Sequence, residues 1–140
     1  MITEELDKKL CRDFPRIFVE RKLSPMQSAM ARGFECGDGW YDIIHDLCTR
    51  IQEHCDKNPN VEQVQARQVK EKFGGLRFYV KGGDKSVVKM IMDTENESYR
   101  TCEKCGSKVR VSCNVTANGW ISSLCQKCSN PQECFIRGYN

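Results

Sequence analysis

The sequence predicts an α+β fold: a helical N-terminal half packed on a β-hairpin, followed by a helix and a small C-terminal ribbon held by four cysteines. Three observations predict it. Residues 40–56 form an apolar stripe of helical period, residues 76–81 alternate after a Gly-Gly pair, and two C-x2-C pairs lie near the C-terminus. At 140 residues the chain suits one domain. We expect an α+β body over residues 1–99 and a ribbon with its tail over residues 100–140, packed as one unit.

The N-terminal half is expected to contain three helices. Apolar residues recur at helical spacing from Leu6 to Phe14, and a proline follows them. A Ser-Pro pair at 24–25 is typical of a helix start and predicts a short helix over residues 24–30. Two glycines around Asp38 mark a tight turn. The clearest helix follows this turn, over residues 40–56.

The middle of the chain changes to the period of a β-hairpin. Residues 64–68 are strand-like and residues 76–81 alternate, with Gly74-Gly75 between them as turn punctuation. The intervening residues 69–73 fit neither pattern clearly. A capped helix is expected next, over residues 86–95.

Four cysteines have the spacing of a zinc site. Cys102 and Cys105 form one C-x2-C pair, Cys125 and Cys128 form another, and nineteen residues separate the pairs. An alternating segment and an Asn-Gly turn lie between them, so a short hairpin can bring the pairs together. Four thiolates around one zinc ion leave no open position, which is typical of a structural site. We therefore predict a zinc ribbon, with Zn as its cofactor.

The N-terminal sequence indicates the cellular compartment, and the compartment in turn decides the expected state of the remaining cysteines. The first residues lack the basic start and apolar run of a signal peptide, so we expect a cytoplasmic protein, and no apolar run approaches the roughly 20 residues of a membrane span. A reducing compartment favours metal-bound and buried thiols over disulfides. The sequence assigns no role to the other six cysteines, which are Cys11, Cys36, Cys48, Cys55, Cys113 and Cys134.

Catalytic residues are not predicted. The chain contains no nucleophile elbow, P-loop, HExxH motif or dinucleotide fingerprint. His45 precedes Cys48 by three residues on the expected helix, so a second metal site with Asp38 is an alternative, but no ligand spacing supports it. We expect a protein that is not an enzyme.

One segment combines cations with aromatic rings. Residues 61–89 carry seven basic and three acidic side chains, among them Lys70 and Lys72, and contain the ring of Phe73. This pattern suits nucleic acid, but the formal net charge of +3 falls by two when four thiolates hold a zinc ion. We instead predict a protein-binding surface, made by the outward side chains of the second strand and one tryptophan: Arg77, Tyr79, Lys81 and Trp120.

Three segments together resemble a family of small zinc-ribbon accessory proteins encoded by bacteriophages and prophages. They are GFECGDGWYD at 33–42, VKEKFGGLRFY at 69–79, and CEKCG at 102–106 with GWI at 119–121 ahead of LC at 124–125. The final ligand of that family is often histidine, whereas this chain has Cys128, which serves zinc equally well, and a further tail.

The resemblance implies an accessory protein made in the cytoplasm of an infected bacterium, and it implies no reaction. We expect a non-enzymatic protein that binds a host or phage protein and inhibits a host defence system. The alternative is a regulator that binds nucleic acid through the ribbon and the basic hairpin. Exposed aromatic residues also make a homodimer conceivable.

Overall fold

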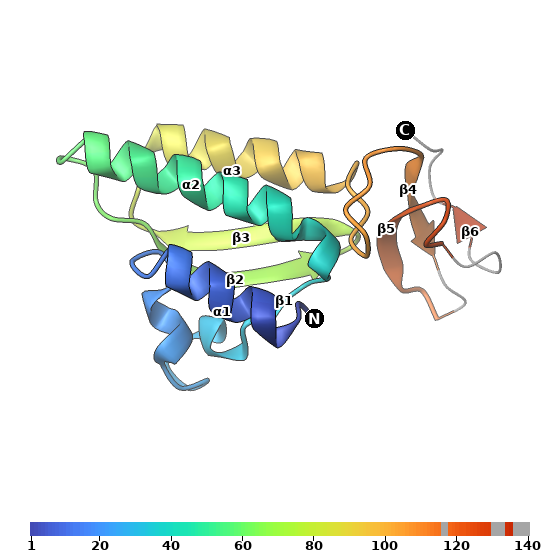
Figure 1. Ribbon diagram of the computed structural model, residues 1–140, viewed down its shortest axis with the longest axis horizontal. Coiled ribbons are helices and arrows are strands. Elements are labelled where there is room, and N and C mark those ends of the chain that lie inside the picture. The colour runs from blue at the N-terminus through green and yellow to red at the C-terminus, as the bar shows by residue number, and fades with distance from the viewer. Residues whose placement is uncertain (116–117, 130–133, 136–140) are drawn as a thin grey trace.

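A computed structural model describes residues 1–115, 118–129 and 134–135 of the chain. These residues form a mixed α+β fold with three α-helices and two small three-stranded sheets (Figure 1). The α-helices are α1 (Glu4–Asp13), α2 (Tyr41–Lys57) and α3 (Lys85–Ser98). The strands are β1 (Phe34–Glu35), β2 (Gln65–Lys72), β3 (Gly75–Lys81), β4 (Val111–Val115), β5 (Ile121–Cys125) and β6 (Cys134–Phe135).

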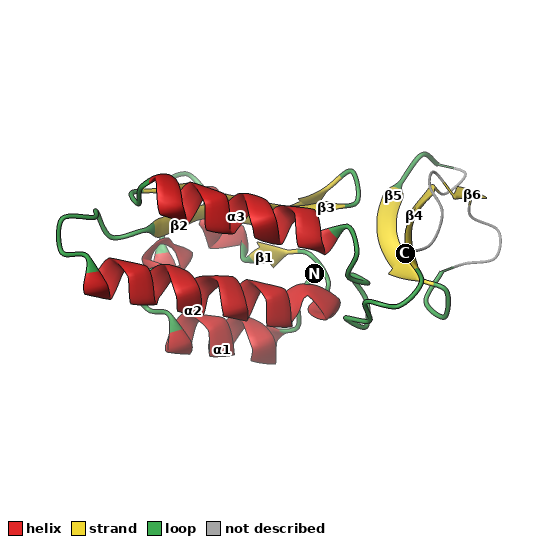
Figure 2. Ribbon diagram, turned by 90° about the horizontal axis from the view of Figure 1, so that it is seen from above, coloured by secondary structure: helices red, strands yellow, loops and turns green. Residues whose placement is uncertain are grey.

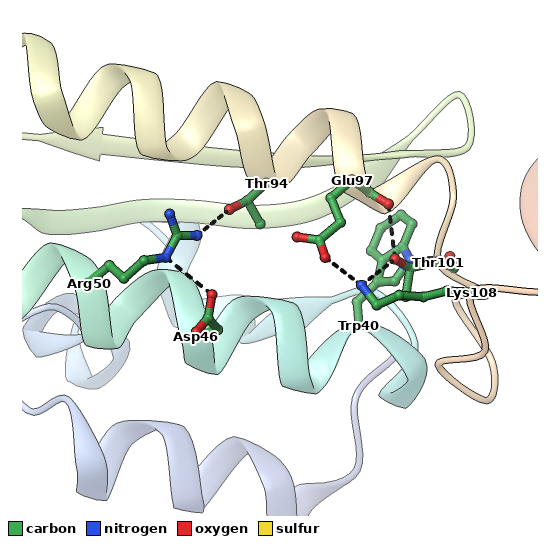
Figure 3. A network of polar contacts seen from close by, with 7 residues as sticks. All are labelled: Trp40, Asp46, Arg50, Thr94, Glu97, Thr101 and Lys108. Atoms are coloured by element: carbon green, nitrogen blue, oxygen red, sulfur yellow. Dashed lines mark hydrogen bonds and ion pairs between the residues drawn. The ribbon is translucent and has the colours of Figure 1, made fainter.

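Helices α2 and α3 lie side by side and run in opposite directions along the first sheet (Figures 1 and 2). The guanidinium of Arg50 joins them, because it donates to Asp46 on its own helix at 3.1 Å and to Thr94 on α3 at 3.1 Å (Figure 3). The predicted helices over residues 40–56 and 86–95 are confirmed, each within a few residues of its expected bounds.

The first sheet has the order β1-β2-β3, with β1 parallel and β3 antiparallel to β2. One row of side chains crosses all three strands through Phe34, Val69 and Phe78, which are buried in the main core with the apolar stripe of α2. The adjacent row, which runs through Lys70 and Arg77, lies on the opposite, partly solvated face. The alternation predicted for residues 76–81 is therefore confirmed.

Two local expectations differ from the structure. Residues 24–30 form turns that lead into a short 3₁₀ helix at Ala29–Arg32, because the side chain of Met26 is solvent-exposed and Met30 is the only apolar residue of the segment that reaches the core. One buried residue cannot stabilise an α-helix of this length. The ambiguous residues 69–73 belong mainly to β2, since Val69 pairs with Phe78 in the buried row.

The second sheet has the order β5-β4-β6 and lies at one end of the body (Figure 1). Strands β4 and β5 form the predicted hairpin between the two cysteine pairs. Strand β6 adds to the other edge of β4, and no sequence pattern predicts a strand in that segment. We call residues 100–129 the ribbon. In the part of the chain that the structure describes, no helix is both long and apolar enough to cross a membrane.

Candidate metal centre

The four predicted cysteines come together at the end of the second sheet. The sulfurs of Cys102, Cys105, Cys125 and Cys128 all lie within 4.8 Å of one another, and those of Cys105 and Cys125 are 3.6 Å apart. Four thiolates at tetrahedral corners around one zinc-sized ion would be roughly 3.8 Å apart, given metal–sulfur bonds of about 2.3 Å. The cluster therefore fits a single metal ion, and protein sulfurs fill every corner of the tetrahedron.

Each cysteine pair sits in a tight backbone turn. In the first turn, the Gly106 N–H donates to the carbonyl of Cys102 at 2.9 Å, and Gly106 adopts a left-handed φ of 82°. In the second turn, the N–H groups of Cys128 and Ser129 both donate to the carbonyl of Cys125, at 3.1 and 3.0 Å. These turns point both sulfurs of a pair to the same side, as a shared ion requires.

The thiols of the cluster influence one another's protonation. Burial raises the pKa of Cys125, but hydrogen bonds from the Cys128 backbone and from the neighbouring thiols outweigh it and lower that pKa to about 7. Burial and the hydrogen bond to Cys125 raise the pKa of Cys128 to about 12. One sulfur is thus ready to bind a cation near neutral pH, and an arriving dication would displace the protons that the others retain.

The first cysteine pair is seated on the turn that precedes α2. The Gly39 N–H donates to the carbonyl of Glu103 at 2.8 Å, and the Gly37 N–H donates to the carboxylate of the same residue at 2.9 Å. A Cβ at Gly39 would overlap the carbonyl of Cys102, and one at Gly37 would overlap that of Glu103. Both glycines are therefore required by the close approach of the metal-binding turn to the body.

Side chains reinforce this seat. The fully buried indole of Trp40 donates from Nε1 to the carbonyl oxygen of Thr101 at 2.9 Å, one residue before the first cysteine (Figure 3). Lys108 of the ribbon reaches back to Glu97 at the end of α3 and to the hydroxyl of Thr101 (Figure 3). The metal cluster is thus attached to both long helices.

A second attachment lies at the turn of the β2–β3 hairpin. Ser123 of β5 donates from Oγ to the carbonyl of Gly74 at 2.6 Å, and its own carbonyl accepts from the Glu103 N–H at 2.9 Å. The side chain of Ile121 would lie 3.1 Å from a Cβ at Gly74, which is buried and has a φ of 86°. The next glycine, Gly75, lies directly against the ring of Tyr99.

Comparisons with known proteins add no assignment to this geometry. No family model, curated protein or solved structure matches the chain. The resemblance to bacteriophage accessory proteins stays a prediction from three sequence segments. The structure shows what those segments do locally: two of them supply glycines that contact the ribbon, and the third supplies the ribbon itself.

The alternative second metal site does not assemble. Cys48 is fully buried among apolar side chains, and this burial raises the pKa of its thiol far above the usual value. His45 instead lies with Nε2 3.1 Å from a carboxylate oxygen of Asp13, and the carboxylate of Asp38 accepts from the Thr3 N–H at 2.7 Å. Among the described residues, the four cysteines form the one cluster suited to a metal ion.

Most of the unassigned cysteines are packing residues. Cys36, Cys55 and Cys113 are buried, and burial raises the pKa of Cys36. Cys11 is half-buried beside Asp7, and burial together with that carboxylate raises its pKa to about 11. The side chain of Cys134 lies outside the described residues.

The residues of the predicted interaction surface lie at different places. Arg77 donates to the carbonyl of Leu76 and, at 3.1 Å, to the hydroxyl of Tyr99, so the residue that caps the C-terminus of α3 holds it in place. Lys81, at the far end of β3, lies 3.0 Å from the buried carboxylate of Glu20. Tyr79 is 44% exposed on the strand between them. The fourth residue, Trp120, lies in the ribbon beside the opposite end of β3.

No pattern in the sequence predicts that Trp120 lies close to Phe73. Trp120 and Phe73 are 64% and 66% exposed, and they line a shallow pocket of about 220 Å³ between the two hairpin turns. The other lining residues are Glu71, Lys72, Gly119 and Ile121. In the sequence, Phe73 belongs to the basic segment. No sequence pattern predicts that the two turns lie side by side, because their contact depends on how the ribbon packs on the body.

Proposed function

We propose that the protein is a non-enzymatic accessory protein of a bacteriophage, stabilised by zinc, which binds a host or phage protein in the infected bacterial cytoplasm and inhibits a host defence system. Zinc is the metal that best suits four thiolates at tetrahedral spacing, and a site filled by protein ligands serves structure. The three sequence segments that resemble bacteriophage proteins support the biological setting.

The observation that carries a binding function is the exposed aromatic pair Phe73 and Trp120. Large aromatic side chains anchor protein interfaces, and here two of them flank one pocket. Phe73 also has a φ of 53°, a left-handed conformation that costs a residue with a Cβ about 1–2 kcal/mol. A solvent-exposed ring in a strained turn contributes nothing to the core, so binding is the role that explains it.

Affinity capture from bacterial lysate tests this proposal. The zinc-loaded protein should retain one discrete protein after nuclease treatment, and the two purified proteins should then bind directly in isothermal titration calorimetry. A change of both Phe73 and Trp120 to serine should abolish the titration signal, while a change of Met26, an apolar residue that is 97% exposed, should not. A partner that binds both variants alike would refute the role of this surface, and no direct partner would refute the function.

A nucleic-acid regulator is the second candidate, because Lys72 lies beside the aromatic pair, Lys70 lies two residues earlier on the same strand, and rings can stack on bases. It predicts that capture fails after nuclease treatment and that binding weakens steeply with salt. Charge reversal at both lysines should then abolish binding to single-stranded oligonucleotides. Zinc leaves the chain close to neutral, and this favours the protein partner.

A further inference from the structure

We propose that the pocket between Phe73 and Trp120 receives one large apolar side chain from an acidic segment of the partner protein. We propose further that the metal-loaded ribbon assembles this pocket. The inference rests on the proposed function and specifies the chemistry of its partner and the condition for binding it. We call the residues that line the pocket, Glu71 to Phe73 and Gly119 to Ile121, the hairpin pocket.

The walls of the hairpin pocket define the apolar part of the ligand. Phe73 and Trp120 form two exposed aromatic walls, and half-buried Ile121 adds a third apolar side chain. A volume of about 220 Å³ accommodates a single large side chain, not a folded element. Burying such a side chain contributes about 1.5–3 kcal/mol, which suits an anchor residue.

The charges beside the hairpin pocket define the rest of the ligand. Lys72 lies with Nζ 5.6 Å from the centre of the Phe73 ring, and Lys70 lies on the same strand two residues earlier. In the described part of the chain, no carboxylate lies within 4.0 Å of either ammonium group. The one acidic lining residue, Glu71, uses Oε2 to accept from the Gly74 N–H at 2.8 Å. Glu71 keeps its negative charge in this bond, so this end of β2 carries two cations, Lys70 and Lys72, against one anion. Aspartate or glutamate beside the anchor complements that excess of positive charge.

A phosphate backbone fits these charges less well. The neighbouring cation, Arg77, already donates to Leu76 and Tyr99, so two lysines remain to contact the ligand. Nucleic-acid binding normally uses many phosphate contacts and a strongly basic surface. Two cations beside one side-chain pocket are better matched to an acidic peptide.

The pocket depends on the ribbon because its two walls belong to different parts of the chain. Phe73 lies in the body, whereas Trp120 and Ile121 precede or begin β5. The Ser123–Gly74 hydrogen bond and the packing of Ile121 on Gly74 hold these parts together. A short hairpin alone is marginally stable in water, so loss of the metal should remove one wall of the pocket.

A display library of short random peptides, selected on the immobilised zinc-loaded protein, tests this inference without knowledge of the partner. Enriched peptides should contain a large apolar residue flanked by Asp or Glu. Fluorescence anisotropy with a labelled enriched peptide should show affinity at least about ten-fold weaker for F73S/W120S and for K70E/K72E. The matched variants M26S and K22E, which change exposed residues elsewhere, should bind as the unchanged protein does. Chelation of the metal should abolish binding.

Several results would overturn the inference. Enrichment of peptides without acidic residues would exclude the charge assignment, and undiminished binding to F73S/W120S would exclude the site. Binding that survives chelation would exclude the role of the metal. A photoreactive group at the apolar position should crosslink to residues 72–75 or 119–121, so crosslinks elsewhere exclude the site even if a variant unfolds.

Two further results separate this inference from the proposed function. A single-stranded oligonucleotide that binds through Phe73 and Trp120, where no acidic peptide is enriched, would replace the inference with nucleic-acid recognition. Direct binding of a captured partner that is unaffected in F73S/W120S would preserve the proposed function and refute this pocket as its site.

Discussion

The indole Nε1 of Trp40 donates a 2.9 Å hydrogen bond to the carbonyl oxygen of Thr101. This bond joins the start of α2 to the residue that precedes the first metal ligand, across 61 positions of sequence. Since Trp40 is fully buried, the carbonyl has no access to water on that side. The helix and the metal-binding turn therefore stabilise each other.

Replacement of Trp40 by phenylalanine should destabilise the whole chain. The change keeps an aromatic ring but leaves the Thr101 carbonyl without its donor, which costs about 1–3 kcal/mol. Urea unfolding followed by circular dichroism measures the loss. Y79F is the matched control, because it also removes one polar group from an aromatic side chain, and Tyr79 is 44% exposed, so the free energy of unfolding should stay nearly unchanged. Equal losses in both variants would contradict the role assigned to the buried bond.

Replacement of Gly39 by alanine should displace the metal-binding turn. The added Cβ meets the backbone of Cys102 and Glu103, which cannot move aside without breaking the Gly39–Glu103 hydrogen bond. We expect a loss of at least about 2 kcal/mol and a weaker hold on the metal in chelator competition. G119A is the comparison: its φ of 81° strains an alanine by about 1 kcal/mol, but no atom of the described residues lies within 4 Å of the new Cβ.

Removal of the metal should unfold the ribbon and loosen the body. Structural zinc contributes of the order of ten kcal/mol in small sites, far more than the short hairpin can supply. Elemental analysis should give one zinc per chain, and a cobalt-substituted protein should show the absorption of a tetrahedral thiolate complex. C125S should abolish both signals. C113S is the control, since Cys113 is a buried thiol of the same hairpin outside the cluster.

Two or more tightly bound metal ions per chain would contradict this account of the site. Such a count would indicate a second metal site, formed by the histidines or by the cysteines outside the ribbon.

The stability of α3 should depend on pH through Asp84. A hydrogen bond with His54 at 2.9 Å, together with one from the Val87 N–H at 3.1 Å, holds the pKa of Asp84 below its ordinary value of 3.8. A carboxylate with a lowered folded-state pKa contributes stability above its unfolded pKa, and this contribution is lost as the pH falls through the folded-state value. D84N should therefore show a shallower decline of stability below about pH 4 than the unchanged protein.

Urea titrations at a series of acidic pH values measure this difference. D93N is the matched control, because Asp93 is an exposed carboxylate of the same helix that pairs with Lys89 and caps nothing. The D93N curve measures the decrease in the free energy of unfolding that all variants share in acid, including the decrease caused by release of the metal. Parallel curves for D84N and the unchanged protein would show that Asp84 does not control the acid response.

Regular periodicity made the main elements predictable from the sequence. The apolar stripe of α2, the alternation of β3 and the two cysteine pairs each encode local geometry, and all three appear in the structure. The short strand β1 was not predictable, because two residues carry no period and its pairing with β2 depends on the core around Phe34. The helix predicted over residues 24–30 does not form for a similar reason. The segment has a good helix start, but too few of the residues that follow it are buried to stabilise a helix.

The candidate site, too, was predictable from the sequence only in part. The four metal ligands follow from spacing alone, whereas the hairpin pocket follows from how two turns meet in space. The glycines at 37, 39 and 74 were visible as turn residues, but their closeness to the ribbon backbone was not. Likewise, the alternation of residues 76–81 correctly predicts that Lys81 is exposed, but no sequence pattern predicts its ion pair with Glu20.

The seat formed by Gly37 and Gly39 also determines the order in which this chain can fold. Its hydrogen-bond partner, Glu103, lies 66 residues from Gly37 along the chain, and contacts between such distant residues form slowly. The turn before α2 must be in place before the metal-binding turn has a surface to dock on. We therefore expect docking of the metal-binding turn on this seat to be a late step of refolding.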